Sequence, residues 1–156
     1  MRTNIEGIYA AGDVCYAGWK HNDHWFQMRL WTQARQMGFY ASKCITSHIA
    51  KSSPHLYFNF EVFTHVTRFF GFRVILLGLY NGQKLKSNDY KILYRVVPQK
   101  EFIKVILRNG KMKGAILIGE TQFEETFENL IYNQIDLSRF GDHLLDDILD
   151  VEDFFD

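Results

Sequence analysis

The stretch TNIEGIYAAGD, residues 3–13, joins a short apolar run at residues 8–11 to a glycine and an aspartate. The apolar run predicts a β-strand. Its Gly-Asp ending would place a carboxylate at the carboxyl end of a sheet, where open α/β sheets bind their ligands. Gly12 would let a bulky ligand approach the backbone, and Asp13 could accept hydrogen bonds from the hydroxyl groups of a sugar alcohol. The stretch therefore predicts a ligand site at the N-terminal edge of an α/β fold.

The residues after this stretch predict a loop and then a helix. Residues 14–25 are polar and aromatic without a period, whereas the apolar spacing from residue 26 to about residue 48 is helical. The N-terminal amides of that helix would direct a partial positive charge toward a group bound at Asp13. One strand and one helix cannot bury both faces of a sheet, so we expect the neighbouring strands upstream, in a longer protein.

A second unit is expected after a linker at residues 51–56, which contains Ser52-Ser53-Pro54. Alternating or β-branched residues predict strands at 57–62, 72–79, 90–97, 102–108 and 112–118. Residues 64–70 fit either a strand or a helical turn. The second unit, residues 57–141, is thus expected to be an α+β module of antiparallel strands followed by a helix.

Two local motifs predict the structure of the last hairpin and the helix of this second unit. Asn109-Gly110 predicts a type I′ turn between the last two strands, because both positions of that turn need positive φ angles. Thr121 and Glu124 match a capping box, with Thr121 as the N-cap of a helix. The predicted packing face of that helix consists of Phe123, Phe127, Leu130 and Ile131.

The last residues, 142–156, form an acidic and apolar tail. They contain seven acidic residues and no Lys or Arg, interleaved with leucine, isoleucine and phenylalanine. The simplest interpretation is a segment docked on its own domain. The alternative is a segment that binds a partner through Phe154 and Phe155.

The composition of the chain argues against several classes of function. The 18 basic residues balance the 18 acidic ones, so no overall charge recruits nucleic acid or anionic lipid. No run approaches the roughly 20 apolar residues of a membrane span. Cys15 and Cys44 form neither a CxxC motif nor a zinc pattern, and we expect them to be free thiols that serve as small hydrophobes.

The first stretch and the helix behind it resemble a known family. TNIEGIYAAGD, followed by LWTQARQMGFYA at residues 30–41, resembles the second flavin-binding motif of the pyridine nucleotide-disulfide oxidoreductases. The resemblance implies that Asp13 binds the ribityl chain of FAD and that amides at the start of the helix face the pyrimidine edge of the flavin. A helix dipole there would stabilise negative charge on the reduced flavin. The implied cofactor-binding residues are Gly12, Asp13, Val14, Arg29, Leu30 and Trp31; no catalytic residue and no metal ligand is assigned.

The later segments resemble one member of this family over nearly the whole chain, as its C-terminal third. The implied fold is the last strand and helix of a Rossmann-like FAD-binding domain, residues 1–50, followed by an interface-like C-terminal module. The implied function is that of an FAD-dependent NAD(P)H oxidoreductase when the protein is full-length, with this fragment inactive alone. The alternative is a non-catalytic interaction module from a truncated form.

The chain also departs from the family pattern. The GxGxxG fingerprint for the adenine half of FAD and the second glycine-rich fold for NAD(P)H are absent, so both would come from N-terminal domains that the chain lacks. The absence of CxxC favours oxygen or a quinone-like acceptor over a disulfide. The resemblance further implies a protein of the nucleus or cytoplasm with a tRNA-splicing ligase complex as partner, and without membrane or direct nucleic-acid binding.

Three further features each allow two interpretations. The loop at residues 21–24 contains two histidines and an aspartate, but such a loop is more typical of a solvated segment than of a zinc site with four fixed ligands. Trp19, Trp25 and Trp31 would cover either the helix and linker or the flavin. Cys15 would be either a passive thiol or a redox-active one with a pKa lowered by the helix N-terminus.

Overall fold

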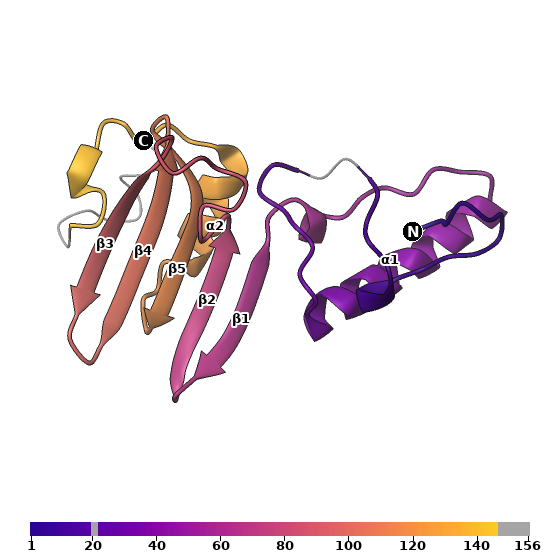
Figure 1. Ribbon diagram of the computed structural model, residues 1–156, viewed down its shortest axis with the longest axis horizontal. Coiled ribbons are helices and arrows are strands. Elements are labelled where there is room, and N and C mark those ends of the chain that lie inside the picture. The colour runs from indigo at the N-terminus through magenta and orange to yellow at the C-terminus, as the bar shows by residue number, and fades with distance from the viewer. Residues whose placement is uncertain (20–21, 147–156) are drawn as a thin grey trace. The chain divides into compact units, whose positions relative to one another are not determined.

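The computed structural model describes residues 1–19 and 22–146 of the chain. They belong to two compact units, Met1–Glu61 and Val62–Asp156, and each unit has its own hydrophobic core (Figure 1). In the described part of the chain, no helix is both long enough and apolar enough to cross a membrane.

The first unit is built around one long helix. A short 3₁₀ turn, η1 (Gly12–Val14), precedes helix α1 (Trp31–Ile49), and the described residues between them, 15–19 and 22–30, form no helix or strand. A second 3₁₀ turn, η2 (Phe58–Phe60), follows α1. The buried residues of α1 recur every three or four positions, as expected for a helix packed on one side. These residues are Gln33, Met37, Tyr40, Ala41 and Cys44.

Phe60 lies at the centre of the core of the first unit. It is 1% exposed, and its ring centroid lies 5.3 Å from that of Trp19, 5.6 Å from that of Trp25 and 5.3 Å from that of Tyr40. These ring contacts hold η2 against α1, because aromatic side chains bury large apolar areas. The strand predicted at residues 57–62 was therefore wrong: the packing of Phe60 turns the chain there.

The strand predicted at residues 8–11 is present only as an isolated antiparallel bridge between Arg2 and Tyr9. The Ala10 amide donates a hydrogen bond of 3.1 Å to the carbonyl oxygen of Met1. A strand needs a neighbour along its length, and within the described residues only this short N-terminal segment pairs with it. The prediction of a strand was thus wrong for the chain as it stands.

Helix α1 begins at Trp31 rather than at Phe26, because a side chain satisfies the backbone of the intervening segment. The Gln33 side chain accepts a 2.7 Å hydrogen bond from the Met28 amide and donates one of 3.1 Å to the carbonyl of Phe26. Leu30 is extended, with φ −129° and ψ 138°. The bonds from Gln33 replace those that a helix would have made, so the predicted helix start was too early.

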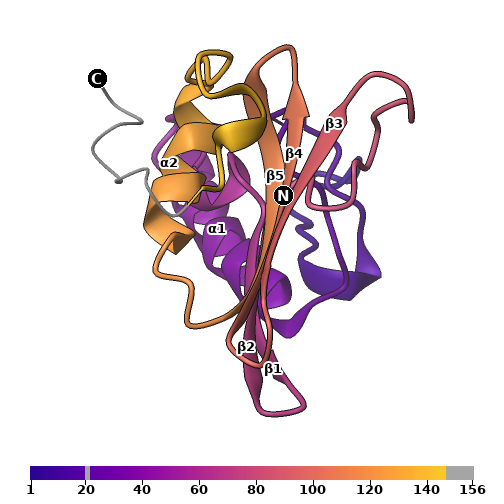
Figure 2. The same cartoon turned by 90° about the vertical axis from the view of Figure 1, so that its left-hand side faces the viewer.

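The second unit is an antiparallel five-stranded sheet with one helix on it (Figure 2). Its strands are β1 (Thr64–Phe69), β2 (Phe72–Gly78), β3 (Lys91–Val97), β4 (Glu101–Arg108) and β5 (Lys111–Gly119), in the order β1-β2-β5-β4-β3. Helix α2 (Glu124–Asn133) packs against β5 and β2. The four strands predicted between residues 72 and 118 are confirmed, and the ambiguous residues 64–70 form β1.

The core of the second unit lies between the sheet and α2. Ile75 pairs with Leu117, and Leu117 pairs with Ile103, so these side chains share one face of the sheet. All three are at most 2% exposed. The predicted helix face is confirmed, because the α2 segment contributes Phe127, Leu130 and Ile131 to this core, with Phe123 packed against it.

The hairpin between β4 and β5 turns at Asn109 and Gly110, whose φ angles are 52° and 71°. Positive φ at both positions is what a type I′ turn requires, so the predicted turn is confirmed. A Cβ on Gly110 would lie 2.0 Å from Oγ of Ser138. The turn therefore needs glycine for the close approach of the segment after α2 as well.

The predicted capping box is not formed. Helix α2 begins at Glu124 after Phe123, and no side chain caps its first turn. The Glu124 carboxylate pairs instead with the guanidinium of Arg73 on β2. Within the described residues, the buried hydroxyl of Thr121 has no hydrogen-bond partner. The prediction was wrong because Glu124 is the first helical residue and its carboxylate is bound by the sheet.

The described beginning of the predicted tail docks on the second unit. Leu144 and Leu145 are buried in its core, and the carbonyl of Leu145 accepts a 3.3 Å hydrogen bond from Arg95. These contacts favour the docked interpretation for residues 142–146. Phe154 and Phe155, the basis of the alternative, lie outside the described residues.

Candidate functional site

Gly12 and the start of α1 form one local structure. Gly12 has a φ of +80°, a conformation that favours glycine. A Cβ on Gly12 would lie 3.3 Å from Cβ of Ala34, so the backbone of Gly12 is packed against α1. Asp13 and Val14 complete the η1 turn. The turn that carries the predicted carboxylate is therefore held beside the N-terminal part of the helix.

The structure packs residues 12–14 against α1 at Ala34, and residues 29–31 lie at the start of the same helix. Asp13 and Arg29 are exposed, and Leu30 is half-buried. Val14 and Trp31 are 85% and 75% exposed. Apart from Gly12, which is buried against α1, the predicted residues thus present their side chains largely to solvent.

The charges at this place are a carboxylate and the positive end of a helix. The first turn of α1 contains no acidic residue, and its N-cap, Leu30, makes no side-chain hydrogen bond. The partial positive charge of the helix N-terminus is therefore not neutralised from within the helix. The Asp13 carboxylate pairs with no side chain or backbone donor in residues 1–19 and 22–146.

This set of donors and acceptors fits the implied FAD. A free carboxylate accepts hydrogen bonds from hydroxyl groups, which the ribityl chain offers in a row. Free amides at a helix N-terminus donate hydrogen bonds to groups that carry negative charge, as the pyrimidine edge of a reduced flavin does. Asp13 and the start of α1 supply the two kinds of group from adjacent segments.

A glutamine that belongs to no motif holds the loop in front of α1. The Gln27 side chain accepts a 2.8 Å hydrogen bond from the Ala17 amide and donates one of 2.9 Å to the carbonyl of Cys15. Together with Gln33, it fixes two segments of the loop, residues 15–17 and residues 26–28. The burial of Gln33 could have been predicted, because Gln33 lies on the same helix face as Met37. Nothing in the sequence indicates that Gln27 binds the loop backbone.

Two of the three tryptophans pack in the core of the first unit, and the third is exposed. Trp25 is 1% exposed in the core, and Trp19 packs against it at a ring-centroid distance of 5.7 Å. Both therefore cover the helix. Trp31 stands exposed at the start of α1, with the guanidinium carbon of Arg35 5.7 Å from its ring centroid. Of the three, Trp31 has the position to touch a ligand at the helix start.

Both cysteines are free thiols, as predicted, and Cys44 is buried. The half-buried Cys15 donates a weak hydrogen bond from its thiol to the carbonyl of Gly12, with Sγ and O 3.5 Å apart. Burial raises the pKa of the Tyr40 phenol, and the neighbouring Cys44 raises it further. The phenol is therefore neutral at physiological pH.

No group of three His, Cys, Asp or Glu side chains in the described part of the chain is arranged to hold a metal ion. Within the loop considered for a metal, His24 is buried, at 5% exposure. His21 lies outside the described residues.

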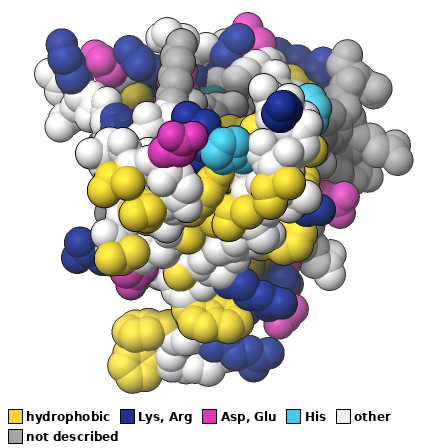
Figure 3. Space-filling view, turned by 90° about the vertical axis from the view of Figure 1, so that its right-hand side faces the viewer, with side chains coloured by type: hydrophobic (Ala, Val, Ile, Leu, Met, Phe, Trp, Pro, Cys, Tyr) yellow, Lys and Arg dark blue, Asp and Glu magenta, His cyan; other side chains and the backbone are white. Residues whose placement is uncertain are grey.

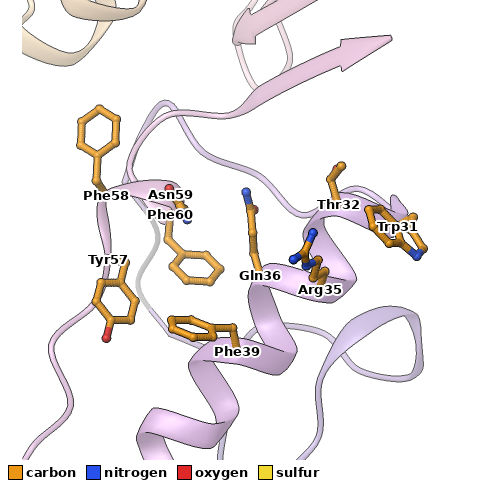
Figure 4. A pocket seen from close by; sticks show the side chains of 9 residues that line it. All are labelled: Trp31, Thr32, Arg35, Gln36, Phe39, Tyr57, Phe58, Asn59 and Phe60. Atoms are coloured by element: carbon orange, nitrogen blue, oxygen red, sulfur yellow. The ribbon is translucent and has the colours of Figure 1, made fainter.

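A groove of about 500 Å³ follows one flank of α1, between this helix and η2 (Figure 4). It could not be expected from the sequence, because the residues around Phe58 were predicted to form a strand. Aromatic side chains predominate in its lining, which consists of Trp31, Thr32, Arg35, Gln36, Phe39, Tyr57, Phe58, Asn59 and Phe60.

No family model matches the chain. Over all 156 residues it is 53% identical to pyridine nucleotide-disulfide oxidoreductase domain-containing protein 1 of Mus musculus, 31% of which it covers. Identity to the protein of the same name is 53% in Drosophila melanogaster, with 33% of that protein covered. In Dictyostelium discoideum it is 46%, with 32% covered. The chain thus spans about a third of the length of these curated relatives and matches their C-terminal part.

Proposed function

We propose that the chain is the counterpart of the C-terminal part of these relatives and that it forms one part of an FAD-dependent NAD(P)H oxidoreductase. Residues 1–50 complete a Rossmann-like FAD-binding domain, and residues 57–141 form its C-terminal module. The observation that supports the proposal is the packing of Gly12 against Ala34, which holds the η1 turn containing Asp13 beside the N-terminal part of α1.

Each residue of the site has a defined task in this proposal. The Asp13 carboxylate accepts hydrogen bonds from the ribityl hydroxyls, and Gly12 keeps the turn close to α1. The amides at Leu30 and Trp31 donate to the pyrimidine edge, where the helix dipole stabilises negative charge. Bound FAD supplies the ring system that accepts a hydride from NAD(P)H. The glycine-rich folds for both nucleotides come from sequence outside this chain.

Molecular oxygen and quinones are the two proposed electron acceptors of the full-length protein. A tRNA-splicing ligase complex in the nucleus or cytoplasm is the proposed partner of the full-length protein.

A comparison of two preparations tests the proposal. The chain alone is expected to be colourless and to oxidise no NADH, since it holds only the ribityl side of the site. The full-length protein is expected to be yellow, with about one flavin per polypeptide by its visible spectrum. If the chain alone binds stoichiometric FAD and oxidises NADH, the proposal that it holds only one part of the flavin site is wrong.

A second candidate function is that of a non-catalytic interaction module, residues 55–156. The face of the sheet that carries Phe72 and Val96, opposite to the core face, favours it. These two side chains are 46% and 61% exposed, and Tyr94 beside them is 59% exposed. Exposed apolar patches mark interaction sites. Two results together would favour this candidate. The full-length protein would not oxidise NADH, and the variant Val96→Glu would lose a partner that co-purifies with the parent protein.

A further inference from the structure

The groove beside α1 exposes an unusual number of large aromatic side chains. Trp31 is 75% exposed, Phe39 60%, Phe58 46% and Tyr57 38%, while Phe60 at 1% is part of the core below. In the space-filling view of Figure 3, hydrophobic side chains, in yellow, are exposed at several places on the face that is drawn. Exposed aromatic side chains around one hollow are typical of ligand sites rather than of ordinary surface.

The side chains of the groove come from both of its walls. In Figure 4, Gln36 and Phe39 point from α1 toward Phe60 of η2. The rings of Phe39 and Tyr57 have their centroids 6.1 Å apart, at an interplanar angle of 41°. Rings from two walls offer flat apolar faces, and a ligand with a planar ring system would stack on them.

The charge in and beside the groove is positive. Arg35 lines it, and the Lys43 ammonium lies 5.6 Å from the ring centroid of Phe39. Neither cation pairs with a carboxylate in residues 1–19 and 22–146, and no acidic side chain lines the groove. Cations without an acidic partner favour a ligand that carries negative or strongly polarised oxygen. The polar lining residues Thr32, Gln36 and Asn59 add hydrogen-bond donors for such oxygens.

From this lining we propose that the groove binds a planar aromatic electron acceptor of the quinone class. A quinone has both features that the groove would recognise, a flat ring system and carbonyl oxygens that become negative on reduction. The volume of about 500 Å³ suits a small molecule rather than a protein segment. The groove begins at Trp31, the residue that also starts the helix of the proposed flavin site.

This inference rests on the proposed function, which supplies the reductant. NAD(P)H gives two electrons and one proton as a hydride, the solvent gives the second proton, and the quinone becomes a hydroquinone. The residues of the groove bind and orient the acceptor. The Arg35 guanidinium stabilises the negative oxygen as it forms.

Titration calorimetry of the full-length protein with anthraquinone-2-sulfonate tests the groove without any turnover. This probe is planar and anionic, and it does not alkylate thiols such as Cys15. We expect saturable binding that weakens at least fivefold in Arg35→Ala and in Phe39→Ala. The control variants Arg68→Ala and Phe70→Ala remove an exposed cation and an exposed ring from the second unit, and we expect them to bind the probe as the parent protein does.

Sodium sulfate, titrated in the same way, serves as the anion without the ring, and we expect no heat of binding from it. The flavin content of each sample is read from its visible spectrum, so the groove inference and the proposed function are tested independently. A flavin-loaded protein that does not bind anthraquinone-2-sulfonate overturns the groove inference and leaves the proposed function standing. Equal weakening by the groove variants and by the control variants also overturns it. A parent protein without flavin that still binds the probe through Arg35 and Phe39 refutes the proposed function alone.

Discussion

Gly12 lies against Ala34 so closely that a Cβ on the glycine would be 3.3 Å from Cβ of the alanine. This contact connects η1 to α1, which are separated in the sequence by residues 15–30. It therefore fixes where Asp13 stands relative to the start of the helix. The proposed flavin site depends on it, because the carboxylate and the helix amides come from these two elements.

Replacing Gly12 by alanine is expected to destabilise the first unit. The backbone at φ +80° costs an L-residue about 1–2 kcal/mol, and the crowding against Ala34 costs about 1 kcal/mol more. Gly7 provides the control, because its φ is +79° and no atom lies within 4 Å of the position that a Cβ would take there. Urea unfolding of the two alanine variants should therefore differ by the cost of crowding. Equal losses would show that Ala34 does not restrict the turn.

The ion pair of Arg95 and Glu101 is expected to matter for the second unit. The guanidinium donates hydrogen bonds of 2.6 and 2.9 Å to one carboxylate oxygen, and the Glu101 side chain is only 6% exposed. Glu101→Gln should lower the free energy of unfolding by about 3 kcal/mol, because it removes the negative charge that compensates the largely buried guanidinium of Arg95. Asp89→Asn breaks the exposed pair with Arg108, at 3.6 Å, and should cost less than about 1 kcal/mol. Similar losses in the two variants would contradict this assignment.

Helix α2 is held to the sheet by Phe127, which is 1% exposed. Phe127→Ala should lower the free energy of unfolding by about 3–5 kcal/mol, since it removes a buried ring and leaves a cavity. Tyr132 on the same helix is 41% exposed, and Tyr132→Ala should cost less than half as much. Thermal or urea unfolding measures both. A cost for Phe127→Ala as small as that for Tyr132→Ala would mean that the helix does not cover the core as described.

Asp136 is expected to give the second unit a sensitivity to acid. Hydrogen bonds from the side chain and the backbone amide of Ser138, and the charge of Lys111, hold the pKa of the Asp136 carboxyl below its usual range. A lowered folded-state pKa contributes stability above the unfolded pKa of about 3.9, and this stability is lost as pH falls through the folded pKa. NMR titration of the carboxyl should show the pKa rising in Ser138→Ala. An unchanged pKa in that variant would remove Ser138 as the cause.

The sequence predicted those parts of the fold that local chemistry determines. Asn109 and Gly110 specify their turn because only residues that tolerate positive φ fit it. The spacing of Met37, Ala41 and Cys44 specifies the buried face of α1, and alternation specifies the strands. The Gly12-Asp13 motif was also identified from two adjacent residues, and the role of Asp13 in ligand binding stays a prediction.

The predictions that were wrong concern structure that depends on contacts between residues far apart in the chain. Phe60 turns the chain at η2 because it packs on Trp19 and Trp25, and alternation around it looked like a strand. Glu124, which was predicted to complete a capping box, pairs instead with Arg73 on β2, 51 positions earlier in the chain. The groove joins α1 to η2, so it could not be read from either segment alone.

The amount of flavin retained by the full-length protein carrying Asp13→Ala tests the account most directly. The variant and the control Asp23→Ala, which removes an exposed aspartate from the loop before α1, are purified side by side and their flavin-to-protein ratios are compared. Removing the acceptor for the ribityl hydroxyls should weaken FAD binding about tenfold or more, which corresponds to about 1.4 kcal/mol. We predict a clear loss of flavin from Asp13→Ala and none from Asp23→Ala. Full flavin retention by Asp13→Ala, with affinity equal to that of the control, would contradict the assignment of this carboxylate to the flavin site.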